Sequence, residues 1–225
     1  MKTTRSAVIV PSRGRSIRIN ECMDSLIAHT VDADIFVVLD EDDYHNYRKY
    51  KNVNYLVGPR PERLGVNEKL NRIANQLKDD YDYIMWAADD TVVLTPSWDT
   101  LLVDAIKDIK HGISYPNDLL QGARLPSNGT CFDTSIVRTL GYLAPPTLLH
   151  LFIDNYWRHL GQTLETLRYC EDVKLEHKHY VNKKALVDPI YKAVNAPWMY
   201  DHDRNALAAY LKNDFVSDLR KLTVS

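Results

Sequence analysis

The sequence has few cysteines and no long apolar run, and both absences bear on where the protein works. Its three cysteines, Cys22, Cys131 and Cys170, are far apart and form no Cys-x-x-Cys pair. This argues against a disulfide framework or a zinc knuckle and favours a reducing compartment. The apolar run at residues 7–10 is too short for a signal-peptide core. No run approaches the roughly 20 apolar residues of a membrane span, so we expect a cytoplasmic protein without a membrane-spanning segment.

The common nucleotide-binding loops are absent as well. No Gly-x-Gly-x-x-Gly follows the first apolar run, and Gly-x-x-x-x-Gly-Lys-Ser/Thr occurs nowhere in the chain. These absences weaken an assignment as a dehydrogenase or a P-loop NTPase. The net charge of −2 gives no overall attraction to nucleic acid or to anionic membranes, although it leaves room for a local basic patch.

Strand and helix patterns alternate through the first half of the chain. Short apolar runs typical of buried strands occupy residues 7–10, 34–39, 53–57 and 84–88. Helical spacing of apolar residues lies at 17–28, after Gly65 and after Pro96. This alternation predicts a mostly parallel α/β sheet with right-handed crossovers.

The second half of the chain is less regular. Its patterns predict strands at 111–118 and 172–181, and helices at 134–140, 148–160 and 205–222. The chain has 225 residues, with no internal repeat and no linker-like stretch. We therefore predict one α/β domain whose two halves, residues 1–110 and 111–225, have different functional roles.

Charged side chains follow three of the predicted strands. Arg13 and Arg15 come after the first strand, Asp40 after the second, and Asp89 and Asp90 after the strand at 84–88. In open α/β sheets, ligands bind at the carboxyl ends of the strands. Arginines beside a glycine suit phosphate oxygens, and adjacent carboxylates suit a hard divalent cation. A solvated loop is the alternative for each of these segments.

Two further candidates lie in the second half. Asp154 stands in an apolar segment predicted as a helix, where burial would raise its pKa and suit it to act as a general base. The alternative is a surface ion pair with Arg158, four residues on. His177 and His179 would share an otherwise apolar strand face, where they could ligate a metal or hold a phosphate.

Taken in order, these segments resemble the GT-A fold of nucleotide-sugar-dependent glycosyltransferases, close to the family-2 type encoded by tailed bacteriophages. The matching segments are Pro11–Arg15, the strand ending at Asp40, Gly65–Asn71, the strand ending at Asp90, Gly141, Asp154-Asn155 and His177–Tyr180. No single segment is specific, but their order covers nearly the whole chain. The resemblance implies a single GT-A-like domain, with a nucleotide-sugar-binding half at 1–110 and an acceptor-binding half at 111–225.

The resemblance also implies roles for individual residues. Asp89 matches the last acid of the family's Asp-x-Asp motif, which binds Mn²⁺ or Mg²⁺ on the diphosphate, while Ala87 replaces the first acid. His177, or after it His179, matches a late metal-binding histidine. Asp154 matches the catalytic base of inverting members. The other residues implied in binding the sugar donor are Pro11, Ser12, Arg13, Arg15, Asp40, Asn67 and Lys69.

Together these roles predict a metal-dependent, inverting transfer of sugar from a UDP-sugar to an acceptor hydroxyl. The phage relatives point to a hydroxymethylated base in phage DNA, or to a glycan, and to the host cytoplasm as the location. A lysine cluster would approach DNA phosphates or form a solvated face; it comprises Lys174, Lys178, Lys183 and Lys184. The alternatives are a sugar-nucleotide nucleotidyltransferase, for which Arg13-Gly-Arg15 is a poor first loop, and a non-catalytic binding module, for which Ala87 argues.

Overall fold

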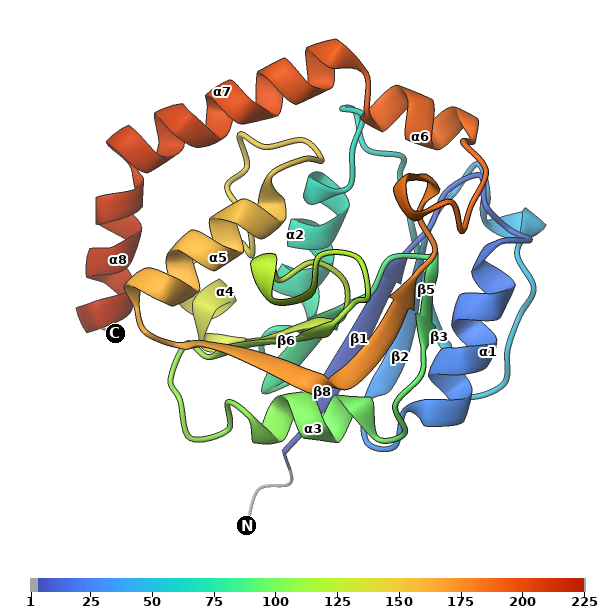
Figure 1. Ribbon diagram of the computed structural model, residues 1–225, viewed down its shortest axis with the longest axis horizontal. Helices are drawn as coiled ribbons and strands as arrows, with labels where there is room; N and C mark the ends of the chain where they lie inside the picture. Colours follow the sequence, from blue (N-terminus) through green and yellow to red (C-terminus); the bar gives the residue numbers. More distant parts are fainter. Residues whose placement is uncertain (1–3, 225) are drawn as a thin grey trace.

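An eight-stranded sheet in the order β3-β2-β1-β4-β7-β6-β8-β5 forms the centre of the protein, seen here in a computed structural model that describes residues 4–224 (Figure 1). The strands are β1 Ser6–Pro11, β2 Asp34–Asp40, β3 Asn54–Gly58, β4 Tyr83–Trp86, β5 Thr91–Val93, β6 Ile113–Asn117, β7 Thr130–Asp133 and β8 Leu167–His177. The helices are α1 Ile19–His29, α2 Asn67–Leu77, α3 Trp98–Asp104, α4 Ser135–Leu140, α5 Ile153–Thr163, α6 Pro189–Val194, α7 Pro197–Asn213 and α8 Phe215–Val224. Within residues 4–224, no helix is both long and apolar enough to span a membrane.

The sheet is mostly parallel, as predicted. β3, β2, β1 and β4 run parallel to one another, so their carboxyl ends share one edge. β7 then pairs antiparallel with both β4 and β6, and β8 pairs parallel with β6 and antiparallel with β5. The prediction of an α/β domain on a mostly parallel sheet is therefore confirmed, with the antiparallel pairs confined to the second half of the sheet order.

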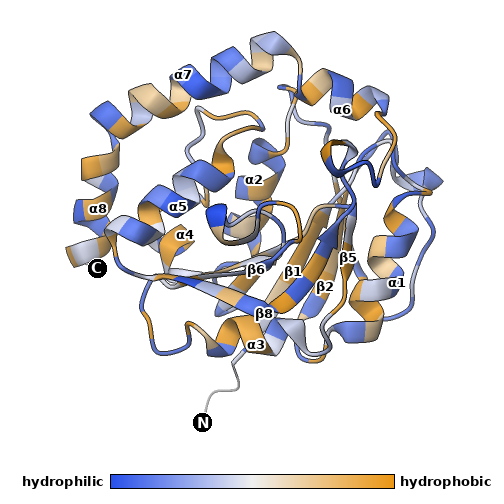
Figure 2. Cartoon of the chain, in the orientation of Figure 1, coloured by the Kyte–Doolittle hydropathy of each residue, from blue (hydrophilic) through white to orange (hydrophobic). Residues whose placement is uncertain are grey.

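Two apolar cores cover the two faces of this sheet. Successive residues of a strand point to opposite faces, and β1 follows the rule with Ala7 and Ile9 in one core and Val8 and Val10 in the other. The first core is closed by α2, α4, α5, α7 and α8, and the second by α1 and α3 (Figures 1 and 2). With helices on both faces, the open edge at the strand ends is left for a ligand.

The helix predicted at 148–160 begins only at Ile153. Residues 149–151 instead form a loop whose three backbone N–H groups donate to the carboxylate of Asp203, at 2.7–2.9 Å. Gly65 lies against this loop with φ +130°, and a Cβ there would sit 2.2 Å from the carbonyl oxygen of Leu149. These residues thus form a partly buried loop, because the Asp203 carboxylate, distant in the sequence, satisfies their backbone N–H groups.

Other element boundaries also differ from the prediction. The strand at 84–88 ends at Trp86, and the strand at 172–181 extends from Leu167 only to His177. The helix at 205–222 begins earlier, at Pro197, and is broken between Asn213 and Phe215, where the Phe215 ring turns to pack on Tyr156. β5, β7 and α6 were not predicted.

Candidate functional site

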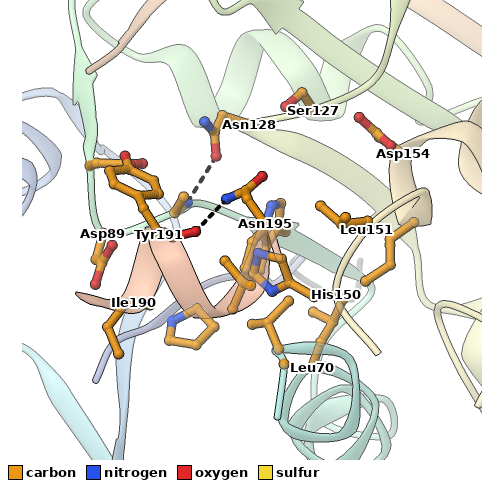
Figure 3. A pocket seen from close by; sticks show the side chains of 18 of the residues that line it. Leu70, Asp89, Ser127, Asn128, His150, Leu151, Asp154, Ile190, Tyr191 and Asn195 are labelled. Carbon is orange, nitrogen blue, oxygen red and sulfur yellow. Dashed lines mark hydrogen bonds between the residues drawn. The ribbon is translucent and has the colours of Figure 1, made fainter. Parts of the chain in front are cut away.

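The carboxyl ends of β1, β2 and β4 open into a cavity of about 840 Å³. Its other walls come from the N-terminal ends of α2 and α5 and from α6 (Figure 3). Of the residues predicted for the site, those that line this cavity are Pro11, Ser12, Arg13, Arg15, Asp40, Lys69, Asp89, Asp154, His177 and His179. The topology therefore brings together side chains that are up to about 170 positions apart in the chain, because parallel strand ends converge.

Asn67 is the predicted residue that the structure does not bring to the cavity. Its side-chain amide is buried and donates to the carbonyl oxygens of Pro145 and Leu148, both at 2.8 Å. Its own N–H donates to the carbonyl of Leu149. Asn67 thus holds the loop that precedes α5, rather than presenting a free amide to a ligand.

A buried ion-pair cluster closes the floor of the cavity at the end of β2. The Asp40 carboxylate is fully buried; it lies 2.7 Å from Nζ of Lys69 and 2.8 Å from Nη1 of Arg13. Burial lowers the pKa of Lys69, although its contact with Asp40 opposes the change. Arg13 also forms two hydrogen bonds to the exposed carboxylate of Asp42, at 2.7 and 2.8 Å, so the two cations of the cluster are balanced by two carboxylates.

Asp89 has both carboxylate oxygens engaged. Oδ2 accepts a hydrogen bond from Oγ of Ser12 at 2.6 Å, and Oδ1 accepts one from Nη1 of Arg15 at 2.8 Å. Both partners come from the loop after β1, so Asp89 fixes that loop against the end of β4. The Arg15 side chain is 11% exposed, and its orientation toward the cavity is held by this contact.

The two carboxylate oxygens of Asp90 differ in their contacts. Oδ2 accepts hydrogen bonds from the Tyr191 hydroxyl and from Nη2 of Arg18. Oδ1 is buried, has no hydrogen-bond partner among residues 4–224, and lies 3.5 Å from Nε2 of His177. A buried carboxylate oxygen facing an imidazole nitrogen at this distance is an arrangement in which a cation could be shared.

His179 lies beside His177, although not on the strand face that the sequence predicted. β8 ends at His177, and His179 caps the short turn of helix at Tyr180–Asn182, accepting a hydrogen bond from the N–H of Val181. The two imidazole rings are 5.1 Å apart. Burial lowers the pKa of His179 to about 4, so its ring is neutral at neutral pH and serves as an acceptor.

Asp154 lies in the first turn of α5, and its carboxylate reaches the cavity on the side opposite Asp89 in Figure 3. It forms no ion pair with Arg158; its Oδ1 accepts a hydrogen bond from the N–H of Asn155 at 2.9 Å. Burial raises the pKa of Asp154 from 3.8 to about 6. The surface ion pair considered for this residue is therefore absent, and its environment suits a base that works near neutral pH.

Replacement of Asp154 by Asn is expected to stabilise the protein at pH 8. The folded state holds a proton that the unfolded chain loses near pH 3.8, so wild-type stability falls as pH rises from about 4 to about 6. The full difference corresponds to roughly 3 kcal/mol. Calorimetric Tm values should show a gain for Asp154→Asn at pH 8 that shrinks at pH 4. No gain at pH 8, or the same gain for Arg158→Ala, would contradict this reading.

The residues that sequence reasoning missed belong mainly to α6 and the turn before it. Arg15 and Arg18 lie over the ring of Tyr191, at 4.3 and 4.8 Å from its centre. The Asp188 carboxylate pairs with the same two arginines, at 2.9 and 3.3 Å. A signal was present in the sequence, because Asp188-Pro189 is an N-cap followed by proline at the first helical position.

The donor set of the cavity fits a divalent cation that shares its coordination with a ligand. Residues 4–224 contain no group of three or more His, Cys, Asp or Glu side chains arranged to hold a metal ion alone. Asp90 Oδ1 and His177 Nε2 supply two potential ligands. Mg²⁺ bound with phosphates takes few protein ligands and completes its shell with phosphate oxygens and water. The pair is therefore adequate for such a shared site.

Comparison with known proteins identifies the fold. No protein-family model and no curated protein sequence matches the chain. The mannosyltransferase PcManGT from Pyrobaculum calidifontis, in complex with GDP-Man and Mn²⁺, is similar in structure with a TM-score of 0.60 at 14% identity, covering 99% of this chain and 80% of its own. Glucosyl-3-phosphoglycerate synthase from Mycobacterium tuberculosis, in complex with Mg²⁺ and UDP, gives 0.60 at 12%, covering 92% and 79%. TarS of S. aureus gives 0.56 at 16%, covering 95% of this chain but 44% of its own. The chain has the GT-A fold of these glycosyltransferases.

Proposed function

We propose that the protein is a metal-dependent glycosyltransferase that moves a sugar from a UDP-sugar to an acceptor hydroxyl, with inversion. One observation carries the proposal: a single cavity holds the Asp90–His177 pair at the strand ends and, across from it, the partly buried carboxylate of Asp154, whose pKa is raised. A leaving diphosphate needs cations on one side, and an attacking hydroxyl needs a base on the other. The GT-A fold supports this proposal, as do the complexes of its structural neighbours with GDP-Man and Mn²⁺ and with UDP and Mg²⁺.

The sugar donor would bind along the ends of β1, β2 and β4. The cavity of about 840 Å³ lies within the roughly 300–1,000 Å³ range of small-molecule sites. Arg13 and Arg15 now bind the carboxylates of Asp42 and Asp188 with two hydrogen bonds each, and they would hold phosphate oxygens in the same way on exchanging these partners. Asp40, paired with Arg13 and Lys69, would lie under the nucleoside.

Asp90 and His177 would hold the cation, Mn²⁺ before Mg²⁺ because of the imidazole nitrogen. When bound, the cation would neutralise charge on the diphosphate leaving group. Asp89, the ligand implied by the sequence resemblance, would instead support Arg15 and Ser12, since both of its oxygens are already engaged.

Asp154 would act as the general base. Its carboxylate would take the proton from the acceptor hydroxyl as that oxygen forms the new bond to the anomeric carbon, while the bond to the diphosphate oxygen breaks. Attack from the face opposite the leaving group inverts the anomeric centre. With its pKa raised to about 6, Asp154 is a stronger base than an exposed aspartate and is still mostly ionised at neutral pH.

The acceptor would be a glycan in the first instance, and a hydroxymethylated base in phage DNA in the second. Two of the four clustered lysines, Lys178 and Lys184, pair with Glu21 and Glu176. Only Lys174 and Lys183 of this cluster then remain to bind DNA phosphates, and two phosphate contacts would contribute little to DNA affinity. A steep fall of DNA affinity with salt would reverse this order.

Release of UDP or GDP from a panel of nucleotide-sugars, with Mn²⁺ and with EDTA, tests the proposal. At least one UDP-sugar should be hydrolysed slowly without an acceptor, and EDTA should stop the reaction. Binding of UDP without turnover of any sugar donor would favour a non-catalytic module. Pyrophosphate release from a nucleoside triphosphate and a sugar phosphate would favour a nucleotidyltransferase.

A further inference from the structure

We propose that Asp118 is a positioning residue that fixes the tautomer of His177, so that the imidazole presents an unprotonated Nε2 toward Asp90. The metal-binding part of this inference rests on the function proposed above. The tautomer itself does not, because it is a property of the metal-free protein.

The Asp118 carboxylate is locked in one orientation. It follows β6 and is 2% exposed. Oδ1 accepts three backbone hydrogen bonds, from Leu120 at 3.1 Å, Gln121 at 2.6 Å and Gly122 at 2.9 Å. These bonds cap the loop after β6 and satisfy the hydrogen-bonding capacity of Oδ1. They leave Oδ2 buried and without a hydrogen-bond partner in the part of the chain that the structure describes.

The second oxygen faces His177. Asp118 Oδ2 lies 3.6 Å from Nδ1 of His177, which is also buried and has no hydrogen-bond partner within the described residues. The backbone N–H of His177 donates to the carbonyl of Asp118 at 3.1 Å, so the two residues are tied to each other through the main chain. A small approach of the side chains would complete an Nδ1–H to Oδ2 hydrogen bond.

His177 therefore stands between two carboxylates, and a neutral imidazole has one N–H to donate. Asp90 already receives hydrogen bonds from Arg18 and Tyr191. Asp118 has no Lys or Arg partner among residues 4–224, which makes it the carboxylate more in need of the imidazole proton. Metal-binding histidines commonly donate their second ring N–H to a carboxylate, which fixes the ring and its tautomer. The chain Asp118–His177–Asp90 has this form.

The variant Asp118→Asn inverts the polarity of this contact and keeps the loop cap. The amide oxygen of Asn must take the Oδ1 position, because an NH₂ group there would face three backbone N–H donors. The NH₂ group then occupies the Oδ2 position and donates to Nδ1 of His177. The ring is driven to its Nε2–H tautomer, whose proton points at Asp90 and occupies the lone pair that a cation would need.

The test is ¹⁵N NMR of the histidine side chains in the metal-free protein, with His177 assigned by His177→Gln. The wild type should show the Nδ1–H form and Asp118→Asn the Nε2–H form. Mn²⁺ affinity in the presence of UDP, measured by EPR, should fall about 10- to 100-fold in the variant. Asp99→Asn is the matched control, since Asp99 is also a buried carboxylate that accepts backbone N–H bonds, from Val31, Asp32 and Ala33. It should lower Tm without changing the His177 tautomer.

An Nε2–H tautomer in the wild type, or an unchanged tautomer in Asp118→Asn, would overturn the inference. The wild-type spectrum alone decides the matter if the variant does not fold. A tautomer that changes as expected, in a protein that binds no Mn²⁺ with UDP, would leave the positioning role standing and remove the proposed metal site.

Discussion

Asp154→Asn is expected to reduce sugar transfer by about 10³-fold while leaving UDP-sugar binding within a factor of two or three of wild type, because a general base contributes roughly 10²–10⁴ to the rate. The amide keeps the size of the side chain and its contact with the N–H of Asn155, but it cannot take a proton. The sugar-donor end of the cavity is built from other residues. Initial rates of transfer and calorimetric titration with the UDP-sugar measure the two effects separately.

The pH dependence gives the same prediction a second readout. The base must be ionised, and burial sets the pKa of Asp154 at about 6, so wild-type kcat/KM should fall about tenfold per pH unit below that value. Arg158→Ala, one turn further along α5, is the control and should keep both rate and profile. If Asp154→Asn loses donor binding together with activity, the carboxylate is structural and the mechanism is wrong.

The second large effect is expected at the cation. Asp90→Asn should lower Mn²⁺-dependent transfer by about 10²-fold or more and weaken activation by Mn²⁺, because it removes one of two protein ligands that would help stabilise the leaving diphosphate. Rates measured across a Mn²⁺ titration give both numbers. The hydrogen bond from Tyr191 gives the amide a fixed orientation, so the side chain should stay in place.

Asp89→Asn, at the adjacent carboxylate, is the matched control for Asp90→Asn. Asp89 holds Ser12 and Arg15, so its variant should weaken binding of the sugar donor and keep the Mn²⁺ concentration that gives half activation. The reverse outcome, in which Asp89→Asn abolishes Mn²⁺ activation and Asp90→Asn does not, would restore the ligand that the sequence resemblance implies.

Local pattern was sufficient to predict the first half of the fold. The strands β1, β2 and β3 are short apolar runs, and the helices α1 and α2 between the strands are amphipathic segments. Each pattern can be recognised within about a dozen residues. β5 and β7 have three and four residues, too few to show a period. The segment at 149–151 was predicted as helix from its local apolar pattern. It is a loop because its N–H groups donate to Asp203, more than 50 positions away, which a local pattern cannot show.

The site was predictable to the extent that strand ends converge. Side chains that follow β1, β2 and β4 lie together because parallel strands share an edge. The sequence pattern did not show which side chains each carboxylate would contact. The hydrogen bonds of Asp89 to Ser12 and Arg15, and those that engage only one oxygen of Asp90 within residues 4–224, join residues 70 or more positions apart. Asn67 was assigned to the cavity from the resemblance of Gly65–Asn71 alone; that segment could not show that the carbonyl partners of its amide lie in the loop before α5.

Anomalous diffraction from a crystal soaked with UDP and Mn²⁺ tests the central claim most directly. The account predicts a Mn²⁺ peak in contact with Asp90 Oδ1, His177 Nε2 and the diphosphate of UDP in the cavity at the ends of β1 and β4. UDP bound there without a Mn²⁺ peak, or a peak held by other residues while Asp90 and His177 stay unengaged, would contradict it.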